Sequence, residues 1–279
     1  MNIIADSGST KAEFKLLTEN PEEKSIILPG INPFYQSETE IRELIHTELY
    51  PNVTGCDIQK IHFYGAGCAF PDKKKMLENA LSYSFPQAEI FIESDLLAAA
   101  RALFGTSKGV ACILGTGSNS CLYNGHEIEK NVSPLGFILG DEGSGAVLGR
   151  KFISDCLKNQ LPFSLQKKFF SQYNISPPEI LDRVYKQPFP NRYLASFTPF
   201  LLENIGEEPI YQLVRKSFTG FFERNIKQYA ITGEKVGFIG SIAYYFRDVL
   251  REVANELHYQ LGKIERNPME GLIRFHQEK

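Results

Sequence analysis

The 279-residue sequence lacks several features that would place it at once in a familiar class of protein. Its five cysteines are scattered and include no CxxC pair, which argues against a disulfide framework and against a zinc site built from neighbouring residues. No stretch approaches about 20 apolar residues, and the first residues contain an acid but no basic segment, so we expect neither a transmembrane helix nor a signal peptide. Scattered thiols are typical of a reducing cytosol, and we expect a cytoplasmic protein.

The sequence also has little net charge. Thirty Lys and Arg residues against 33 Asp and Glu residues give −3 at pH 7, with a pI near 6.0. This balance predicts neither the broad basic surface that nucleic acid requires nor attraction to an anionic membrane. The length suits two ordinary domains or one large domain, and the absence of a low-complexity linker predicts domains that pack closely.

Three common catalytic and binding patterns are absent as well. There is no GxxxxGK[ST] motif, which excludes the P-loop, and no GxSxG motif to support a serine hydrolase. The five histidines show no ligand-like spacing. The chemistry must therefore come from the carboxylates, hydroxyls and glycines that the sequence does contain.

The first 105 residues alternate between patterns typical of strands and patterns typical of helices. Apolar alternation and turn residues predict strands at 2–5, 12–18, 24–30, 60–67 and 88–95, and amphipathic spacing predicts helices at 37–50, 72–85 and 96–105. An alternation of this kind favours an α/β fold with a mixed sheet covered on both faces.

After Gly105 the pattern begins again and then becomes more helical. Strand, turn and strand are predicted over 109–125, with a candidate third strand directly after them. Further on we expect helices at 143–160, 174–185 and 207–230, a loop and a helix between the last two, a short strand and a long helix within 235–259, and a terminal helix after Pro268.

The two openings resemble each other. IIADSGSTKAEF (3–14) and CILGTGSNSCLY (112–123) each place a glycine and hydroxyl residues between two apolar strands, 109 residues apart. This similarity favours two related α/β halves, each with one glycine-hydroxyl hairpin. Chance is the alternative, because Gly and Ser are common in hairpin turns.

Turns of this type are suited to binding phosphate. Backbone N–H groups converge at a glycine turn, Ser and Thr hydroxyls add donors, and Lys11 adds a positive charge. Asp6 would repel phosphate unless Mg²⁺ lies between them, bound directly or through water. The alternative for Asp6 is an ordinary turn-forming residue.

Three later segments carry further candidates. LGDEGSGAVLGR (139–150) places Asp141 and Glu142 before a glycine-rich helix start, where they would either accept hydrogen bonds from substrate hydroxyls or cap the helix. Asp95 follows a buried strand, where it would act either as a general base or as the N-cap of the next helix. Gly240 and Ser241 join a strand to a helix in a turn that a nucleotide base or ribose would approach.

Together these segments resemble the sugar kinase, Hsp70 and actin superfamily, and within it the group of N-acetylglucosamine kinases and BadF/BcrA-type ATPases. DSGSTK is similar to the first phosphate loop of that group, GTGSNS to the second, and IGSIA to the adenosine loop. GDEGSG followed by LGR is the feature that distinguishes the group. The matches occur in the expected order from residue 6 to about residue 243, and the last residues resemble the terminal helix that returns to the first domain.

The resemblance implies two actin-like (ribonuclease H-like) domains with an interdomain cleft that binds ATP and Mg²⁺. It implies an N-terminal domain of residues 1–107 joined by the terminal helix 267–279, and a C-terminal domain of residues 108–266. The implied reaction is ATP-dependent phosphorylation of an amino sugar, most often N-acetylglucosamine at its 6-hydroxyl, with Asp95 as the base. A homodimer is common in such families.

The implied binding residues follow from the motifs. The sugar contacts are Asn32, Thr116, Asn119 and Asp141; the nucleotide contacts are Gly8, Ser9, Thr10, Lys11, Gly115, Thr116, Gly117, Ser118, Gly240 and Ser241; and the metal contact is Asp6. Ile239 departs from the pattern, since relatives often carry another glycine there.

Two other functions remain open at this stage. One is a BadF-type ATPase that couples its nucleotide state to a partner protein, although the cysteines do not form the cluster that an iron–sulfur member of that group needs. The other is a sugar-sensing module without catalysis, which the intact Asp95 and both phosphate loops disfavour. The residues alone do not distinguish between amino sugars, because pocket contacts make that choice.

Overall fold

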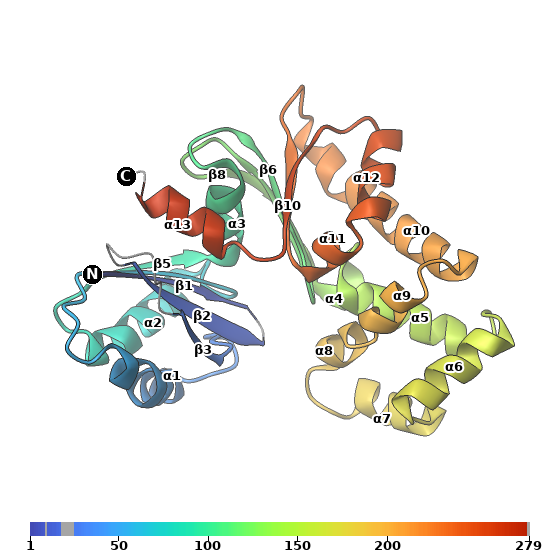
Figure 1. Cartoon of the computed structure of the whole chain (residues 1–279), viewed down its shortest axis with the longest axis horizontal. Coiled ribbons are helices and arrows are strands. Elements are labelled where there is room, and N and C mark those ends of the chain that lie inside the picture. Colours follow the sequence, from blue (N-terminus) through green and yellow to red (C-terminus); the bar gives the residue numbers. More distant parts are fainter. Residues whose placement is uncertain (9, 18–24, 278–279) are drawn as a thin grey trace. The chain divides into compact units, whose positions relative to one another are not determined.

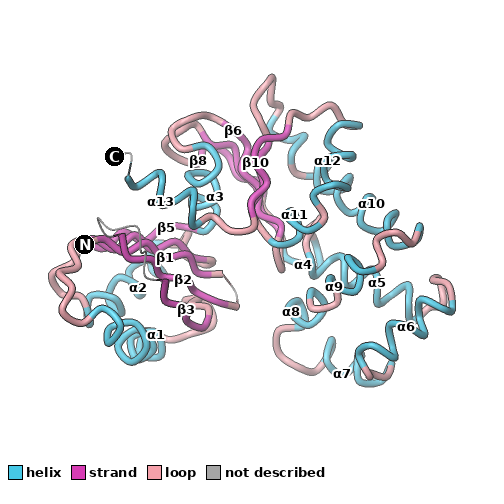
Figure 2. Tube along the Cα trace, in the orientation of Figure 1, coloured by secondary structure: helices cyan, strands magenta, loops and turns pink. Residues whose placement is uncertain are grey.

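The computed structural model describes residues 1–8, 10–17 and 25–277, which form two compact units (Figure 1). Unit 1 comprises Met1–Ser107, Gly125–Glu127 and Pro268–Lys279, and unit 2 comprises Lys108–Asn124 and Ile128–Asn267. Figure 2 shows that each unit combines a sheet with several helices. None of the described helices is both long and apolar enough to cross a lipid bilayer.

The sheet of unit 1 has the order β3-β2-β1-β4-β5. Its strands are β1 (Asn2–Ser7), β2 (Lys11–Leu17), β3 (Ser25–Pro29), β4 (Lys60–Gly65) and β5 (Glu89–Ser94). Strand β2 is antiparallel to both of its neighbours, whereas β1, β4 and β5 are parallel. The five predicted strands and the mixed sheet are confirmed.

Helices cover both faces of this sheet because its central strands are apolar on both sides. Ile3 and Ala5 of β1 pack in one core with α1 (Glu38–Leu44) and α2 (Pro71–Ser84). Ile4, between them, packs in a second core with α3 (Asp95–Phe104) and α13 (Met269–Gln277). Successive residues of a strand point to opposite faces, so this alternation separates the two layers of helices.

The helix predicted at 37–50 begins as expected but does not stay α-helical. Ser37 and Glu40 form a capping box at its start. The α-helix α1 ends at Leu44 and continues as a π-helical stretch, Ile45–Leu49, and then as a 3-10 turn, Tyr50–Val53. Pro51 lies in that last turn, where its missing N–H prevents a regular α-helix from continuing.

The terminal helix packs closely against α3. A Cβ atom at Gly271 would lie 2.4 Å from the carbonyl oxygen of Ala102, so only glycine allows this approach. The predicted terminal helix after Pro268 is confirmed, and it buries Leu272 and Ile273 against the sheet of unit 1.

The sheet of unit 2 repeats the arrangement of unit 1, with the order β10-β9-β6-β7-β8. Its strands are β6 (Gly109–Leu114), β7 (Ser118–Tyr123), β8 (Ile128–Val132), β9 (Val236–Ile239) and β10 (Leu261–Glu265). Strand β7 is antiparallel to β6 and β8, and β6, β9 and β10 are parallel. The two units therefore share strand order and direction, which supports relationship rather than chance as the origin of the repeated turn. Strand β10 was not predicted, because it is a short edge strand with no fully buried residue.

Unit 2 carries more helix than unit 1. Its helices are α4 (Gly136–Leu139), α5 (Gly145–Leu157), α6 (Phe163–Tyr173), α7 (Pro177–Tyr185), α8 (Pro190–Ala195), α9 (Thr198–Glu203), α10 (Glu208–Arg224), α11 (Ser241–Tyr245) and α12 (Arg247–Glu256). A cluster of phenylalanines that includes Phe152, Phe169 and Phe200 joins α5, α6 and α9. Helix α6 has no counterpart among the predicted elements.

Candidate active site

In unit 1 the candidate residues gather at one edge of the sheet. The parallel strands β1, β4 and β5 end in register, with Ser7, Gly65 and Ser94 aligned. Asp6 lies one residue before this edge and Asp95 one residue after it. Parallel strands present their carboxyl ends to the same side, which is the usual position of active sites in α/β proteins.

Asn32 is held at this edge by residues that the sequence did not point out. The hydroxyl of Ser7 donates to the carbonyl of Ile31 (2.9 Å) and accepts from its N–H (2.8 Å). The side-chain oxygen of Asn32 accepts from the N–H of Phe34 (2.9 Å). A Cβ atom at Gly67 would lie 2.8 Å from that same oxygen, so the loop after β4 needs glycine to approach it. Ser7 thus fixes the backbone of Ile31 next to a predicted sugar contact, and Gly67 leaves room for its side chain.

Asp95 is not the cap of the helix that it begins. Ser94 is the N-cap of α3, and its hydroxyl accepts from the N–H of Leu97 (3.2 Å). Oδ1 of Asp95 accepts from the N–H of Leu96 (2.8 Å). The N-cap alternative for Asp95 is therefore wrong. Burial raises the pKa of the Asp95 carboxyl, and its hydrogen bond to Leu96 opposes this rise.

Asp6 lies among other carboxylates. Burial, together with the negative charges of Asp95 and Glu13, raises its pKa to about 7, and the positive charge of Lys11 opposes this rise. Glu13 is the register partner of Asp6 on β2 and pairs with Lys11 at 3.4 Å on the surface. A concentration of negative charge on oxygen ligands suits Mg²⁺, which keeps several waters and needs only one or two carboxylates. Asp6 therefore fits the predicted metal contact through water, although no group of three or more His, Cys, Asp and Glu side chains among the described residues is arranged to hold a metal.

The first glycine turn closes the β1–β2 hairpin. The N–H of Gly8 donates to the carbonyl of Lys11 (3.0 Å), and the carbonyl of Thr10 accepts from the N–H of Gly30 (3.1 Å). Gly8, Thr10 and Lys11 are exposed. The predicted contact Ser9 lies outside the described residues.

The second glycine turn, between β6 and β7, is anchored to the start of α5. The carbonyls of Gly115 and Thr116 accept from the N–H groups of Gly145 (2.8 Å) and Ala146 (3.0 Å). These two donors have no partner inside their own helix, so the turn satisfies them. Among the described residues, the N–H groups of Thr116 and Gly117 donate to no other group, which leaves two backbone donors of this turn for a ligand.

Asp141 contacts the second glycine turn through its side chain. Its Oδ1 accepts from the N–H of Ser118 at 3.3 Å, and its Oδ2 lies 3.1 Å from the position of a Cβ atom at Gly117. Asp141 is 8% exposed and has a positive φ of 53°. Burial is the main reason that its pKa is raised to about 6; the hydrogen bond from Ser118 opposes the rise, and the charge of Glu142 contributes to it.

Two further candidate residues, Glu142 and Asn119, already have side-chain partners within the protein. Glu142 accepts from Nε of Arg224 at 2.6 Å, which gives this carboxylate a structural role. The side-chain oxygen of Asn119 accepts from the N–H of Ser120 and from Nδ2 of Asn131, both at 2.9 Å. The predicted sugar contact Asn119 would therefore have to offer its amide nitrogen.

The β9–α11 turn packs directly on the second glycine turn. Gly240 has a φ of 123°, and a Cβ atom there would lie 2.2 Å from the carbonyl oxygen of Leu114 and 3.2 Å from the nitrogen of Gly115. Ser241 follows as the exposed first residue of α11. Unit 2 thus brings the second turn, Asp141 and the predicted adenosine turn together, although they lie far apart in the sequence.

Two α/β units with the same strand order, each with a glycine-hydroxyl turn in its first hairpin, define an actin-like ATPase fold. Comparison with solved structures specifies the class further. The chain superimposes on a proposed N-acetylglucosamine kinase from Porphyromonas gingivalis with a TM-score of 0.97 and 45% identity, covering 100% of this chain and 99% of that one. The chain belongs to this N-acetylglucosamine kinase family of the actin-like superfamily.

More distant structures share the fold alone. A proposed N-acetylglucosamine kinase from Chromobacterium violaceum has a TM-score of 0.78 at 15% identity, with 98% of both chains covered. A ROK family glucokinase from Streptomyces griseus, solved with glucose and AMPPNP, has a TM-score of 0.61 at 14% identity, covering 99% of this chain and 98% of that one. No family model matches the sequence, and no match was found among curated proteins.

Proposed function

We propose that this ATP-dependent sugar kinase transfers the γ-phosphate of ATP to the 6-hydroxyl of N-acetylglucosamine, with Asp95 as the general base. The observation that carries the proposal is the 45% identity over the whole chain with the Porphyromonas gingivalis protein. The arrangement at Asp95 supports its role, because Ser94 caps α3 and Asp95 accepts from the backbone through Oδ1 alone among the described residues.

The roles of the other residues follow from their positions. Asp95 would accept the proton of the sugar hydroxyl, and its raised pKa makes it a stronger base than an ordinary aspartate. Asn32, whose side-chain oxygen accepts from the N–H of Phe34, would orient the sugar. The backbone donors of Thr116 and Gly117 would bind phosphate oxygens. Gly8, Thr10 and Lys11, which are exposed in unit 1, would supply further nucleotide contacts.

Mg²⁺ near Asp6 would neutralise charge on the transferred phosphoryl group, which is its usual contribution to this reaction. The protein's own contribution is to position the hydroxyl, the base and the phosphate. Positioning of this kind accounts for much of the rate in phosphoryl transfer, since the transition state involves little covalent chemistry with the protein.

A coupled assay of ADP release tests the proposal. The panel contains N-acetylglucosamine, glucosamine, N-acetylmannosamine and 6-deoxy-N-acetylglucosamine, and phosphorus NMR of the product locates the new ester. We expect sugar-dependent ADP release that is highest with N-acetylglucosamine and absent with the 6-deoxy sugar. ADP release that needs no sugar would instead favour the ATPase coupled to a partner protein.

The base is tested by Asp95→Asn, which keeps the oxygen that accepts from Leu96 but removes the charge. We expect kcat to fall by about 10²–10⁴-fold, the usual contribution of a general base, while ATP affinity changes little. The matched control is Glu89→Gln on β5, the strand that leads to Asp95; Glu89 is an exposed carboxylate whose partner is Lys60 at 3.5 Å. Full activity in the Asp95 variant would remove this residue from the mechanism.

A further inference from the structure

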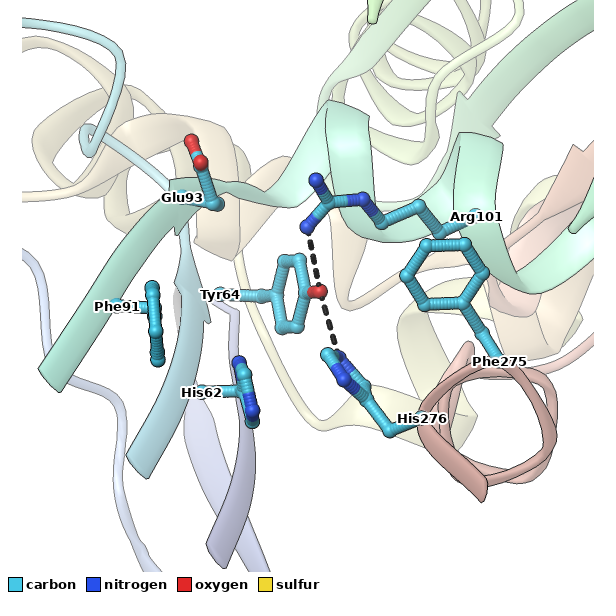
Figure 3. Close-up of a pocket in the computed structure, with 7 residues that line it drawn as sticks. All are labelled: His62, Tyr64, Phe91, Glu93, Arg101, Phe275 and His276. Carbon is cyan, nitrogen blue, oxygen red and sulfur yellow. Dashed lines mark hydrogen bonds between the residues drawn. The ribbon is translucent and has the colours of Figure 1, made fainter. Parts of the chain in front are cut away.

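Unit 1 contains an open pocket of about 200 Å³ on the sheet face that α3 and α13 cover (Figure 3). Side chains from β4, β5, α3 and α13 line it, and none of them belongs to the candidate active site. They are His62, Tyr64, Phe91, Glu93, Arg101, Phe275 and His276.

One wall of the pocket is a row of flat rings. The ring of His62 stacks on that of Phe91, with centroids 4.8 Å apart and planes 9° apart. On its other side His62 contacts the ring of His276, with centroids 4.0 Å apart. Both faces of the His62 ring are therefore covered, and the row presents ring edges, which another aromatic ring can meet in an edge-to-face contact.

Arg101 supplies a positive charge at the other end of the pocket (Figure 3). Its Nη1 donates to the hydroxyl of Tyr64 (2.8 Å), and its Cζ lies 5.7 Å and 5.1 Å from the ring centres of Tyr64 and Phe275. Among the described residues no carboxylate lies within 4 Å of this guanidinium, and its Nε is buried without a hydrogen-bond partner. A partly buried charge normally has a counter-ion, so this arrangement favours an anionic ligand.

The acidic residue of the lining does not cancel this charge. Oε2 of Glu93 accepts from Nζ of Lys74 at 2.6 Å. The Lys74 ammonium therefore balances the Glu93 carboxylate, and the charge of Arg101 is left for a ligand.

We propose that this pocket binds a small organic anion that carries a carboxylate on a flat ring. The carboxylate would pair with the guanidinium of Arg101, whose planar set of donors matches two carboxylate oxygens. The ligand ring would lie against the edges of the stacked rings of His62 and Phe91. The volume limits the ligand to a single small ring, because sites for drug-sized molecules measure roughly 300–1,000 Å³.

Calorimetric titration of the full chain with benzoate tests this site. We expect saturable binding of one benzoate, and at least tenfold weaker binding of benzamide, which has the ring without the charge. Inorganic phosphate, which has the charge without the ring, should also bind at least tenfold more weakly. Equal binding of benzamide would overturn the role of the charge, and equal binding of phosphate would overturn the role of the ring.

Substitutions in the pocket lining test whether benzoate binds at this site. Arg101→Gln should weaken benzoate binding at least tenfold, whereas Arg251→Gln, at an exposed arginine of unit 2 beside Asp248, should leave it unchanged. Phe91→Leu keeps an apolar side chain at a position that is 38% exposed, and it should weaken binding several-fold in a chain that folds normally. Benzoate binding that survives both pocket variants, or no binding to the wild-type chain, would overturn the proposal.

Discussion

Replacing Asp141 by Asn should stabilise the protein, and the gain should depend on pH. The folded protein holds this carboxyl at a pKa of about 6, against 3.8 in its ordinary state, mainly because it is buried. The folded protein therefore binds the Asp141 proton more tightly than the unfolded chain does. The stability that this proton contributes is fully present below pH 3.8 and is lost as the pH rises through about 6. The difference between these two pKa values lowers the free energy of unfolding by at most about 3 kcal/mol at pH 8.

The asparagine side chain suits the position in two ways. Its oxygen still accepts from the N–H of Ser118, and asparagine tolerates the positive φ of 53° better than most residues. The asparagine does not ionise. The free energy of unfolding of the variant should therefore be close to that of the wild-type protein near pH 4 and exceed it by up to about 3 kcal/mol at pH 8. For a unit of this size that gain raises the melting temperature by about 6–12 °C.

Thermal unfolding followed by circular dichroism between pH 4 and pH 8 measures the effect, since the chain has no tryptophan for fluorescence. The control is Asp248→Asn, at a side chain that is 83% exposed, where the same change of charge should shift stability by no more than about 0.5 kcal/mol. A difference between Asp141→Asn and wild type that does not vary with pH, or a loss of stability at pH 8, would refute the reasoning. The same variant should raise KM for the sugar if the ionised carboxylate binds a sugar hydroxyl.

Three further predictions follow. Gly240→Ala places a Cβ atom 2.2 Å from the carbonyl of Leu114, so we expect a large fall in melting temperature and weaker ATP binding, measured by calorimetry. Gly271→Val places side-chain atoms against Ala102, and limited proteolysis should then show that the terminal helix separates from α3 and is cleaved early. Because the pKa of Asp95 is raised, the acid limb of kcat/KM should lie at a higher pH than for an ordinary aspartate, and a limb near pH 4 would contradict its role as base.

The sequence was most informative for strands and turns, which a short pattern of neighbouring residues is sufficient to predict. Apolar residues at every second position predicted β2, because only one of its faces is fully buried. A continuous apolar run predicted β1, because each of its faces packs on a core. The repeated glycine turns predicted two related halves, and both sheets have the same strand order. Edge strand β10 was missed because none of its residues is fully buried, so it has no strong apolar pattern.

Roles that depend on one hydrogen bond were harder to predict. The sequence left Asp95 as either a general base or the N-cap of α3, and only the backbone geometry assigns the cap to Ser94. The local pattern gave Asp141 and Glu142 the same two alternatives, although Arg224, more than 80 residues later, pairs with Glu142. Partners this distant in sequence leave no local pattern.

The sequence by itself determined the turn chemistry, the order of the elements and the family resemblance, because each depends on neighbouring residues. The tertiary structure decided which carboxylates are buried and which groups meet them. Asp6, Asp95 and Asp141 owe their raised pKa values to surroundings assembled from distant segments, and burial of this kind exists only after the chain has folded.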